Sequence, residues 1–281
     1  MINKNIIITG GNAGIGLATS IGLAKKGANI FIVCRSKGKA KKAVDEIKRA
    51  SGNSNVKYFL ADLSSQKSIR AIAEIIKKEV PVIDVLINNA GGVFPEFKLS
   101  EDGLEMTIAT NHFAYFLFTN LLLDNIKKSA EGRIVNVSSD SHYKGEIDVE
   151  SFTVNKGYFI LNAYEQSKLA NVLFTNELAK RLAETNVTVN ALHPGFVKTN
   201  IGNKGTQWYA GLVWSLMTAI GAISTDDGAK TSIYLASAAE GKDVTGKYFD
   251  KCKQKIASPL AFDSKLQKEL WDISEQLCPL A

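Results

Sequence analysis

Short apolar runs alternate with longer amphipathic segments along this chain, and this alternation most constrains the possible fold. The apolar runs predict strands at residues 6–9, 29–34, 56–61, 85–88, 133–138, 187–192 and 247–249. Helical periodicity falls on residues 15–26, 39–50, 65–78, 103–128, 163–184 and 226–237. Continuously apolar runs are typical of parallel strands that helices cover on both faces. The pattern predicts an α/β fold of the Rossmann type, with a doubly wound, parallel seven-stranded sheet.

Composition and punctuation indicate one domain over residues 1–281. The chain is 45% hydrophobic and 22% charged, which allows a large core and excludes a disordered protein. Its five prolines fall outside the interiors of the expected helices, and we find no internal repeat or low-complexity tract.

Cysteine usage and the N-terminal sequence favour a reducing compartment, which we expect to be the cytoplasm. Cys34, Cys252 and Cys278 form no C-x-x-C pair and have no histidine at ligand spacing, so neither a disulfide scaffold nor a metal site is expected. The first residues lead directly into a strand rather than a secretion signal. No stretch approaches the roughly 18 uninterrupted apolar residues of a transmembrane segment.

The net charge of +6 raises the question of a polyanion partner. The lysines are scattered among acidic residues, and the one local cluster lies at residues 37–42, where a solvated helix face explains it. We therefore expect no nucleic-acid partner. The phosphate of a cofactor is a simpler candidate for an anion that this chain binds.

A glycine-rich turn joins the first expected strand to the first expected helix. Gly10 and Gly14 allow a sharp turn close to a pyrophosphate, Gly16 permits close helix packing, and the helix N-terminus offers free N–H groups to anionic oxygens. The spacing is G-x-x-x-G-x-G, and glycines alone also occur in ordinary tight turns. The position between strand and helix favours a dinucleotide site.

The end of the second expected strand indicates which dinucleotide binds. An acidic residue normally holds the free ribose 2′-hydroxyl of NAD there, but this chain has Arg35 and Ser36 and no acid until Asp45. The planar fork of an arginine suits a 2′-phosphate, so NADP is the better choice. The alternative is a surface arginine without a ligand.

Tyr164 and Lys168 are four residues apart in an expected helix, so their side chains should point together. A phenol titrates near about 10 in water, and a neighbouring ammonium favours the phenolate, so the pair can supply an acid or base near neutral pH. Y-x-x-x-K occurs by chance in many helices, and on its own it carries little weight.

The other motifs follow the expected strands in order. They are Asp62-Leu63, Asn88-Asn89-Ala90-Gly91, Asn111, Ser138-Ser139, the pair of Tyr164 and Lys168, and Pro194-Gly195 with Thr199. Each could be an ordinary cap or loop residue, but open α/β sheets bind their ligands at these strand ends. In this order the motifs resemble those of the short-chain dehydrogenase/reductase superfamily over essentially the whole chain.

Within that superfamily, the chain looks most like the NADP-dependent retinol-dehydrogenase group. The similar segments are residues 33–35, 133–139, 164–175, 193–195 and 246–249. The apolar N-terminal anchor of many relatives is missing from this sequence. We therefore expect a soluble enzyme, and the transfer of retinoid specificity is weakened.

The resemblance implies a role for each catalytic candidate. Tyr164 would exchange the proton with the substrate oxygen, and Ser139 would polarise that oxygen. Lys168 would lower the pKa of Tyr164 and bind the nicotinamide ribose, while Asn111 would hold a water that links Lys168 to solvent. Ser138 competes with Ser139, which is preferred because it is the second serine of the pair.

The cofactor site is expected to use residues from every strand end. Its candidates are Gly10, Asn12, Gly14, Ile15, Gly16, Arg35, Ser36, Asp62, Leu63, Asn89, Ala90, Gly91, Tyr164, Lys168, Pro194, Gly195, Val197 and Thr199. The three histidines, His112, His142 and His193, lack a triad order or metal-ligand spacing and are expected to be structural or substrate-loop residues.

Two segments are expected on the substrate side. Residues 140–163 match an insertion of the retinol-dehydrogenase group. Residues 200–225 carry an apolar helical stripe that predicts a lid over a hydrophobic substrate, although core packing, a dimer contact or a membrane-surface contact would explain it equally.

The leading hypothesis is an NADP-dependent oxidoreductase that moves hydride between the nicotinamide and a hydrophobic carbonyl or alcohol, such as a retinal-like aldehyde. The alternative is a non-catalytic NADP-binding regulatory or scaffold protein with the same fold. The helices at residues 103–128 and 163–184 could pair across a homodimer of the family type.

Overall fold

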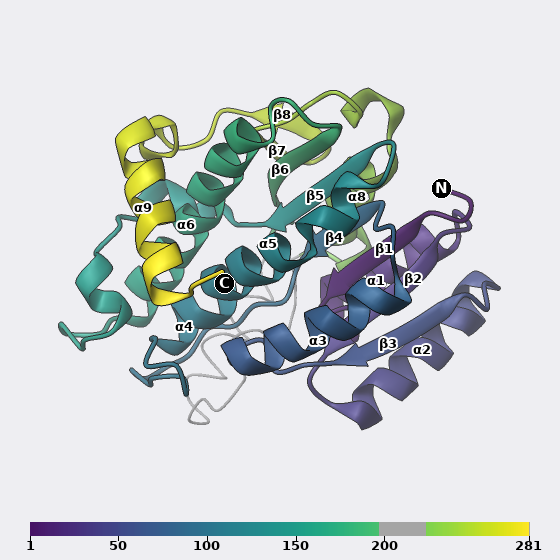
Figure 1. The fold of residues 1–281 in the computed structure, drawn as a ribbon, viewed down its shortest axis with the longest axis horizontal. Helices are drawn as coiled ribbons and strands as arrows, with labels where there is room; N and C mark the ends of the chain where they lie inside the picture. The colour runs from purple at the N-terminus through teal and green to yellow at the C-terminus, as the bar shows by residue number, and fades with distance from the viewer. Residues whose placement is uncertain (197–222, 281) are drawn as a thin grey trace.

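A central sheet of eight strands forms the core of the computed structural model, which describes residues 1–196 and 223–280 (Figure 1). The spatial order is β3-β2-β1-β4-β5-β6-β7-β8. The strands are β1 Asn5–Thr9, β2 Asn29–Cys34, β3 Val56–Leu60, β4 Val85–Asn88, β5 Gly132–Val137, β6 Val187–His193, β7 Lys247–Asp250 and β8 Lys253–Lys255. The parallel, doubly wound fold predicted from the sequence is confirmed.

The eighth strand was not expected. β8 runs antiparallel to β7 at the edge of the sheet, after a turn in which Lys251 and Cys252 have positive φ. Its three residues are polar and exposed, so no apolar pattern marks it in the sequence.

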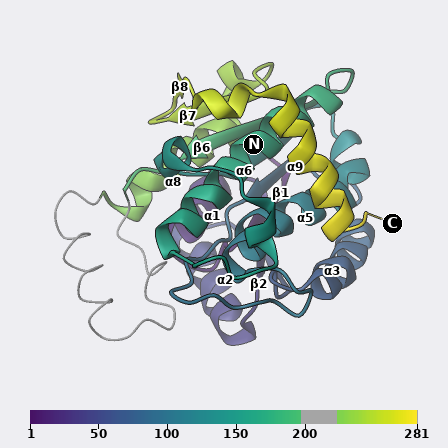
Figure 2. The same ribbon diagram turned by 90° about the vertical axis from the view of Figure 1, so that its left-hand side faces the viewer.

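Helices cover both faces of the sheet, in two separate apolar clusters. One face carries α1 Gly14–Ala24, α2 Lys37–Ser51 and α8 Thr225–Ser237. The other carries α3 Gln66–Glu79, α5 Ala114–Lys127 and α6 Ile160–Arg181. Figure 2 shows α8 and α3 on opposite sides of the strands.

Shorter helical segments lie in the connections. They are α4 Met106–Ile108, η1 Ala109–Phe113, η2 Asp140–Lys144, η3 Val149–Phe152, η5 Ala239–Gly241 and η6 Pro259–Phe262. The single helix expected over residues 103–128 is in fact α4, one π turn (η1) and α5 in succession. π turns inside helices are frequent at functional sites.

The C-terminal helix α9 (Ser264–Leu277) was missed by the sequence analysis, although Asp263 caps its N-terminus. Its Trp271 is 5% exposed and lies 5.0 Å from the ring of Phe116 and 5.9 Å from that of Phe174. The Arg181 guanidinium lies 4.0 Å from the Trp271 ring. Thus α9 covers part of α5 and α6, which belong to the helices that the homodimer hypothesis names. That hypothesis stays a prediction.

Trp271→Ala should strongly destabilise the protein, because it removes the aromatic contacts that attach α9. We expect the free energy of unfolding to fall by about 3–5 kcal/mol, as for other large-to-small core changes. Urea denaturation followed by circular dichroism measures it. Phe262→Ala is the control, since Phe262 is 57% exposed and its loss should change stability by less than about 0.5 kcal/mol. Equal losses in both variants would contradict the packing role of Trp271.

Candidate active site

The parallel register brings four strand ends together at one edge of the sheet. Ile8 of β1 pairs with Ile87 of β4, and Val137 of β5 pairs with Leu192 of β6. The residues that follow these strands therefore share one edge, where open α/β sheets bind ligands. Most of the site residues predicted from the sequence lie there.

The glycine turn has the geometry that a phosphate cradle requires. Gly10 and Gly14 have φ of +67° and +53°, backbone angles that residues with a side chain rarely adopt. A Cβ on Gly16 would lie 2.4 Å from the Gly10 carbonyl oxygen and 2.5 Å from Asn89 Nδ2, so only glycine fits. The helix α1 follows Ala13, whose methyl side chain cannot cap it, and its first N–H groups suit an anion.

A threonine joins the glycine turn to the loop after β4. Thr9 Oγ1 accepts hydrogen bonds from the backbone N–H groups of Asn89 (2.9 Å) and Ala90 (3.0 Å). In return, Asn89 Nδ2 donates to the Thr9 carbonyl oxygen at 2.8 Å. These bonds hold the loop of Asn89, Ala90 and Gly91 against the glycine turn, so that one cofactor could contact both segments.

Arg35 and Asp62 face each other where the adenosine end of a dinucleotide would lie. Arg35 Nη1 is 3.2 Å from Asp62 Oδ2, and the arginine side chain is 73% exposed. Burial tends to raise the pKa of Asp62, but hydrogen bonds from Ser64 and the charge of Arg35 outweigh it and lower that pKa. Because so exposed a pair is weak, Arg35 can turn toward a phosphate.

The other two candidates at this end have structural contacts. Ser36 Oγ accepts a hydrogen bond from the Lys39 N–H at 3.4 Å and caps α2. Leu63 is buried in the core. Their predicted contacts with a cofactor stay predictions.

Lys168 is a buried cation beneath the site, 3% exposed. Its Nζ donates to the Val137 carbonyl oxygen at 3.2 Å and lies 5.4 Å from the centre of the Tyr164 ring. Burial lowers the pKa of Lys168 to about 8. Ser138 Oγ donates to the Lys168 carbonyl oxygen at 2.8 Å, so the first serine of the pair serves the helix that carries the lysine.

Tyr164 and Ser139 form the polar pair at the open side of Lys168. Burial raises the pKa of Tyr164, and the neighbouring Ser139 hydroxyl, which donates to Ser141 Oγ at 3.3 Å, opposes that rise. The phenol therefore stays protonated and able to donate at neutral pH. The lowering influence of Lys168 that the resemblance implies stays a prediction.

Asn111 lies in the π turn η1 and is fully buried. Its Oδ1 accepts from the Gly92 N–H at 2.8 Å, and its Nδ2 donates to the Gly92 carbonyl oxygen and to Ser167 Oγ. A Cβ on Gly91 would lie 3.0 Å from Asn111 Oδ1 and 3.9 Å from Lys168 Nζ. Both polar groups therefore lie on the same side of Gly91, and the water that the resemblance implies between them stays a prediction.

The loop after β6 is described only in part. Pro194 and Gly195 follow His193, and Gly195 has a φ of +88°. Val197, Thr199 and the expected lid up to residue 222 lie outside the described residues. The lid, and its apolar stripe, stay predictions.

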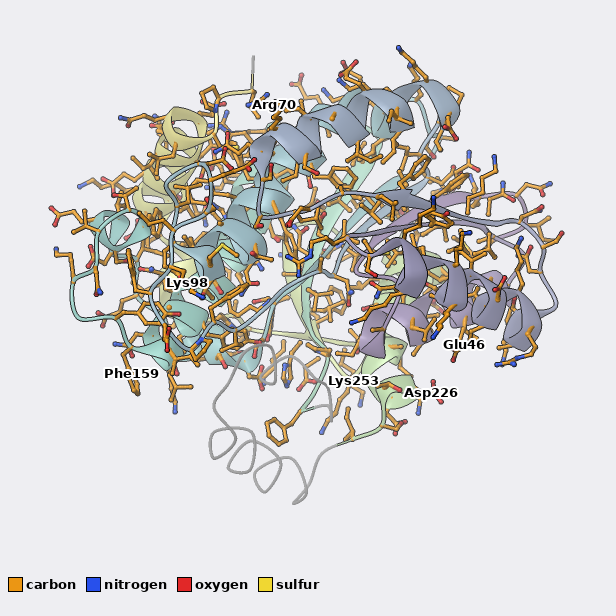
Figure 3. The ribbon with its side chains drawn as sticks, turned by 90° about the horizontal axis from the view of Figure 1, so that it is seen from below. Glu46, Arg70, Lys98, Phe159, Asp226 and Lys253 are labelled. Carbon is orange, nitrogen blue, oxygen red and sulfur yellow. The ribbon has the colours of Figure 1, made fainter. Side chains whose placement is uncertain are left out.

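The expected insertion, residues 140–163, lies beside the start of α6. Tyr158 of this segment donates a hydrogen bond to the Phe94 carbonyl oxygen at 2.6 Å, which joins it to the loop after β4. A cavity of about 460 Å³ opens between the two, with Phe97, Tyr158 and Ala163 in its wall. Figure 3 shows Phe159 on the side of the molecule opposite Glu46 of α2.

Two histidines that the sequence analysis set aside lie directly against the Ser139 turn. His142 Nδ1 is 2.7 Å from the Ser139 carbonyl oxygen, and His193 Nδ1 is 3.2 Å from the Asp140 nitrogen. In the sequence, only the position of His142 three residues after Ser139 indicates a link to the serine pair. The contact of the His142 ring with the Ser139 carbonyl forms only in the folded protein.

Within residues 1–196 and 223–280, no three histidine, cysteine or acidic side chains gather as metal ligands. In the same ranges, every helix is too short or too polar to cross a bilayer.

The family model described as "short chain dehydrogenase" matches residues 4–210. The chain belongs to the short-chain dehydrogenase family. It is therefore a dehydrogenase or reductase of a family that uses a nicotinamide cofactor, and its resemblance to retinol dehydrogenases is confirmed.

The similarity extends over the whole chain. It is 40% identical to retinol dehydrogenase 14 of Homo sapiens, across 100% of this chain and 88% of that protein. It is also 40% identical to the short-chain dehydrogenase TIC 32 A, chloroplastic, of Brassica napus, across 96% of this chain and 87% of that one. A solved but uncharacterized protein from Mycobacterium paratuberculosis has a TM-score of 0.80 at 32% identity, across 99% and 94% of the two chains.

Gly16→Ala should disrupt the phosphate cradle, because its methyl group would collide with the Gly10 carbonyl and Asn89. We expect NADPH affinity to fall at least about tenfold, together with a lower melting temperature. Fluorescence titration and thermal denaturation measure the two. Gly38→Ala is the control: it lies in α2 with nothing within 4 Å of the added methyl, so stability should be kept or slightly raised. Unchanged NADPH affinity in Gly16→Ala would contradict the cradle.

Proposed function

We propose that this protein is an NADP-dependent oxidoreductase that transfers hydride between the nicotinamide and the carbonyl or alcohol carbon of a hydrophobic substrate. One observation carries the proposal. The buried Lys168 ammonium lies beneath the Tyr164 phenol, and the Ser139 hydroxyl lies beside that phenol, at the strand edge that also holds the glycine cradle.

The cofactor site follows from groups that fit a dinucleotide. The first N–H groups of α1 and the backbone of Gly10 to Gly16 would hold the pyrophosphate. Arg35 would pair with the 2′-phosphate in place of Asp62, and Lys168 would bind the nicotinamide ribose. The bound nicotinamide supplies or accepts the hydride.

The protein's own residues manage the proton and the substrate oxygen. Ser139 would donate a hydrogen bond to that oxygen and polarise it, and Tyr164 would give it a proton in reduction or take one in oxidation. The Lys168 charge would stabilise the phenolate that reduction leaves. Asn111 would hold a water between Lys168 and solvent, which restores the proton.

A hydrophobic substrate is supported by the retinol dehydrogenases among the relatives, and a retinal-like aldehyde is one candidate. A relative of equal identity carries another name, so the proposal is a class of apolar aldehydes, ketones and alcohols rather than one compound. We propose a cytoplasmic enzyme.

A substrate panel tests the proposal as a whole. NADPH oxidation would be measured with aldehydes, ketones and quinones of increasing apolar length, beside NADPH binding by fluorescence. Turnover that increases with apolar length is expected. Binding without turnover over the whole panel would instead support a non-catalytic NADP-binding regulatory or scaffold protein.

Tyr164→Phe should abolish turnover and keep NADPH binding, because it removes only the hydroxyl that exchanges the proton. The rate should fall at least about 100-fold, the typical loss for a general acid or base. Steady-state kinetics and fluorescence titration measure both. Tyr143→Phe is the control: this tyrosine is partly exposed and its hydroxyl bonds the Ile256 carbonyl. Wild-type kcat in Tyr164→Phe would refute the assignment.

Wild-type protein should prefer NADPH to NADH, and Arg35→Asp should reverse or strongly reduce that preference. A carboxylate repels the 2′-phosphate and accepts a hydrogen bond from a ribose hydroxyl. The ratio of kcat/KM for the two cofactors measures the change. Arg49→Asp is the matched control, because the same charge change falls in the last turn of α2. Equal KM values for both cofactors in the wild type would contradict the role of Arg35.

A further inference from the structure

The turn that carries Ser139 is held from behind by a histidine. His142 is fully buried, and its Nδ1 lies 2.7 Å from the Ser139 carbonyl oxygen. On the other side of the ring, the Ser258 backbone N–H donates to His142 Nε2 at 3.1 Å. The imidazole therefore bridges the Ser139 turn and the segment after β8.

These two contacts determine the tautomer of His142. A backbone N–H can only donate, so Nε2 must be the acceptor and carry no proton. A carbonyl oxygen can only accept, so Nδ1 must carry the proton and donate it. Only the neutral Nδ1–H form satisfies both neighbours, and the imidazolium would set two N–H donors against each other at Ser258.

The surroundings of His142 keep the ring in place. The rings of Tyr143 and Tyr248 lie 4.1 Å and 4.5 Å from it, between centroids. Tyr248 of β7 donates to Asp140 Oδ1 at 2.9 Å, and Lys255 Nζ of β8 lies 3.1 Å from Asp140 Oδ2. The residue after Ser139 is thus attached to the edge hairpin.

His193 completes the support from the end of β6. Its Nδ1 accepts the Asp140 N–H at 3.2 Å, and its Nε2 lies 3.8 Å from Asp140 Oδ2. Both polar groups of the Ser139–Asp140 peptide bond therefore have an imidazole partner, because His142 binds its carbonyl oxygen and His193 binds its N–H. Two histidines with opposite tautomers face this one turn.

We propose that His142 is a positioning residue, whose Nδ1–H holds the Ser139 carbonyl and so fixes the position of the Ser139 hydroxyl beside Tyr164. This role rests on the proposed function, because the position of the Ser139 hydroxyl matters for catalysis only if that hydroxyl binds the substrate oxygen. Ser139 Oγ also accepts from the Ser141 N–H at 3.2 Å, so a rotation of the turn would move the hydroxyl. A misplacement of about 1 Å in a catalytic group can cost about 100-fold in rate.

Nitrogen-15 NMR of labelled histidines tests the contact without any turnover. At neutral pH we expect His142 to be the neutral Nδ1–H tautomer and His193 the Nε2–H tautomer, with the His142 signals assigned by their loss in His142→Asn. A His142 that is Nε2–H, or protonated at neutral pH, would overturn the proposal whether or not the protein is an enzyme.

Two substitutions separate the two faces of the imidazole. Asn at residue 142 keeps an N–H donor near the Nδ1 position, and Gln keeps an acceptor near the Nε2 position. If His142 positions Ser139, His142→Gln should lower kcat at least about tenfold relative to the wild type. His142→Asn should keep most of the wild-type kcat, and both variants should keep the wild-type affinity for NADPH. A better rescue by Gln than by Asn would show that His142 only secures the Ser258 segment, and would overturn the proposal.

A double-mutant cycle with Ser139→Ala shows through which residue His142 acts. Without the serine hydroxyl, His142→Gln should cause no further loss of kcat. If the fold-losses of kcat in the two single variants multiply in the double variant, the proposal is overturned, because His142 would then act on something other than the Ser139 hydroxyl. Wild-type protein that turns over nothing in the carbonyl panel would refute the proposed function alone, and the NMR tautomer would still decide the role of His142 at the turn.

Discussion

The parallel pairing of β1, β4, β5 and β6 is the constraint on which the site depends. Because their side chains are buried on both faces, a shift in register would expose apolar groups or bury polar ones. The same pairing aligns the four carboxyl ends. The glycine cradle, the Asn89 loop, the serine pair and the loop after His193 thus meet at one edge, although they lie far apart in the sequence.

A buried charge gives this edge its chemistry. Taking the Lys168 ammonium out of water is costly, and its burial is compensated only in part by the Val137 carbonyl. A phenolate at Tyr164 or an anionic cofactor group would complete that compensation. In the proposed reaction, the Lys168 charge would therefore stabilise the phenolate that forms when Tyr164 gives up its proton.

Some features were predictable because their signals are local. The turn at Gly10, Gly14 and Gly16 depends on backbone conformations that few other residues adopt, and Tyr164 and Lys168 are brought together by helical spacing alone. The edge strand β8 and the π turn around Asn111 have no such signal. The first is three polar residues, and the second is a local change of hydrogen bonding within a helical pattern.

The sequence by itself determined the order of the first seven strands and of the main helices between them, the glycine turn and the tyrosine–lysine pair, because each follows from the periodicity or conformational freedom of neighbouring residues. Only the tertiary structure decided what holds Ser139. Ser139 and Ser258 are 119 residues apart, yet His142 bonds to both, and His193 reaches Asp140 from the end of β6. A histidine has no charge pattern or periodicity that reveals its tautomer, because the tautomer is set by the donors and acceptors that folding places around the ring.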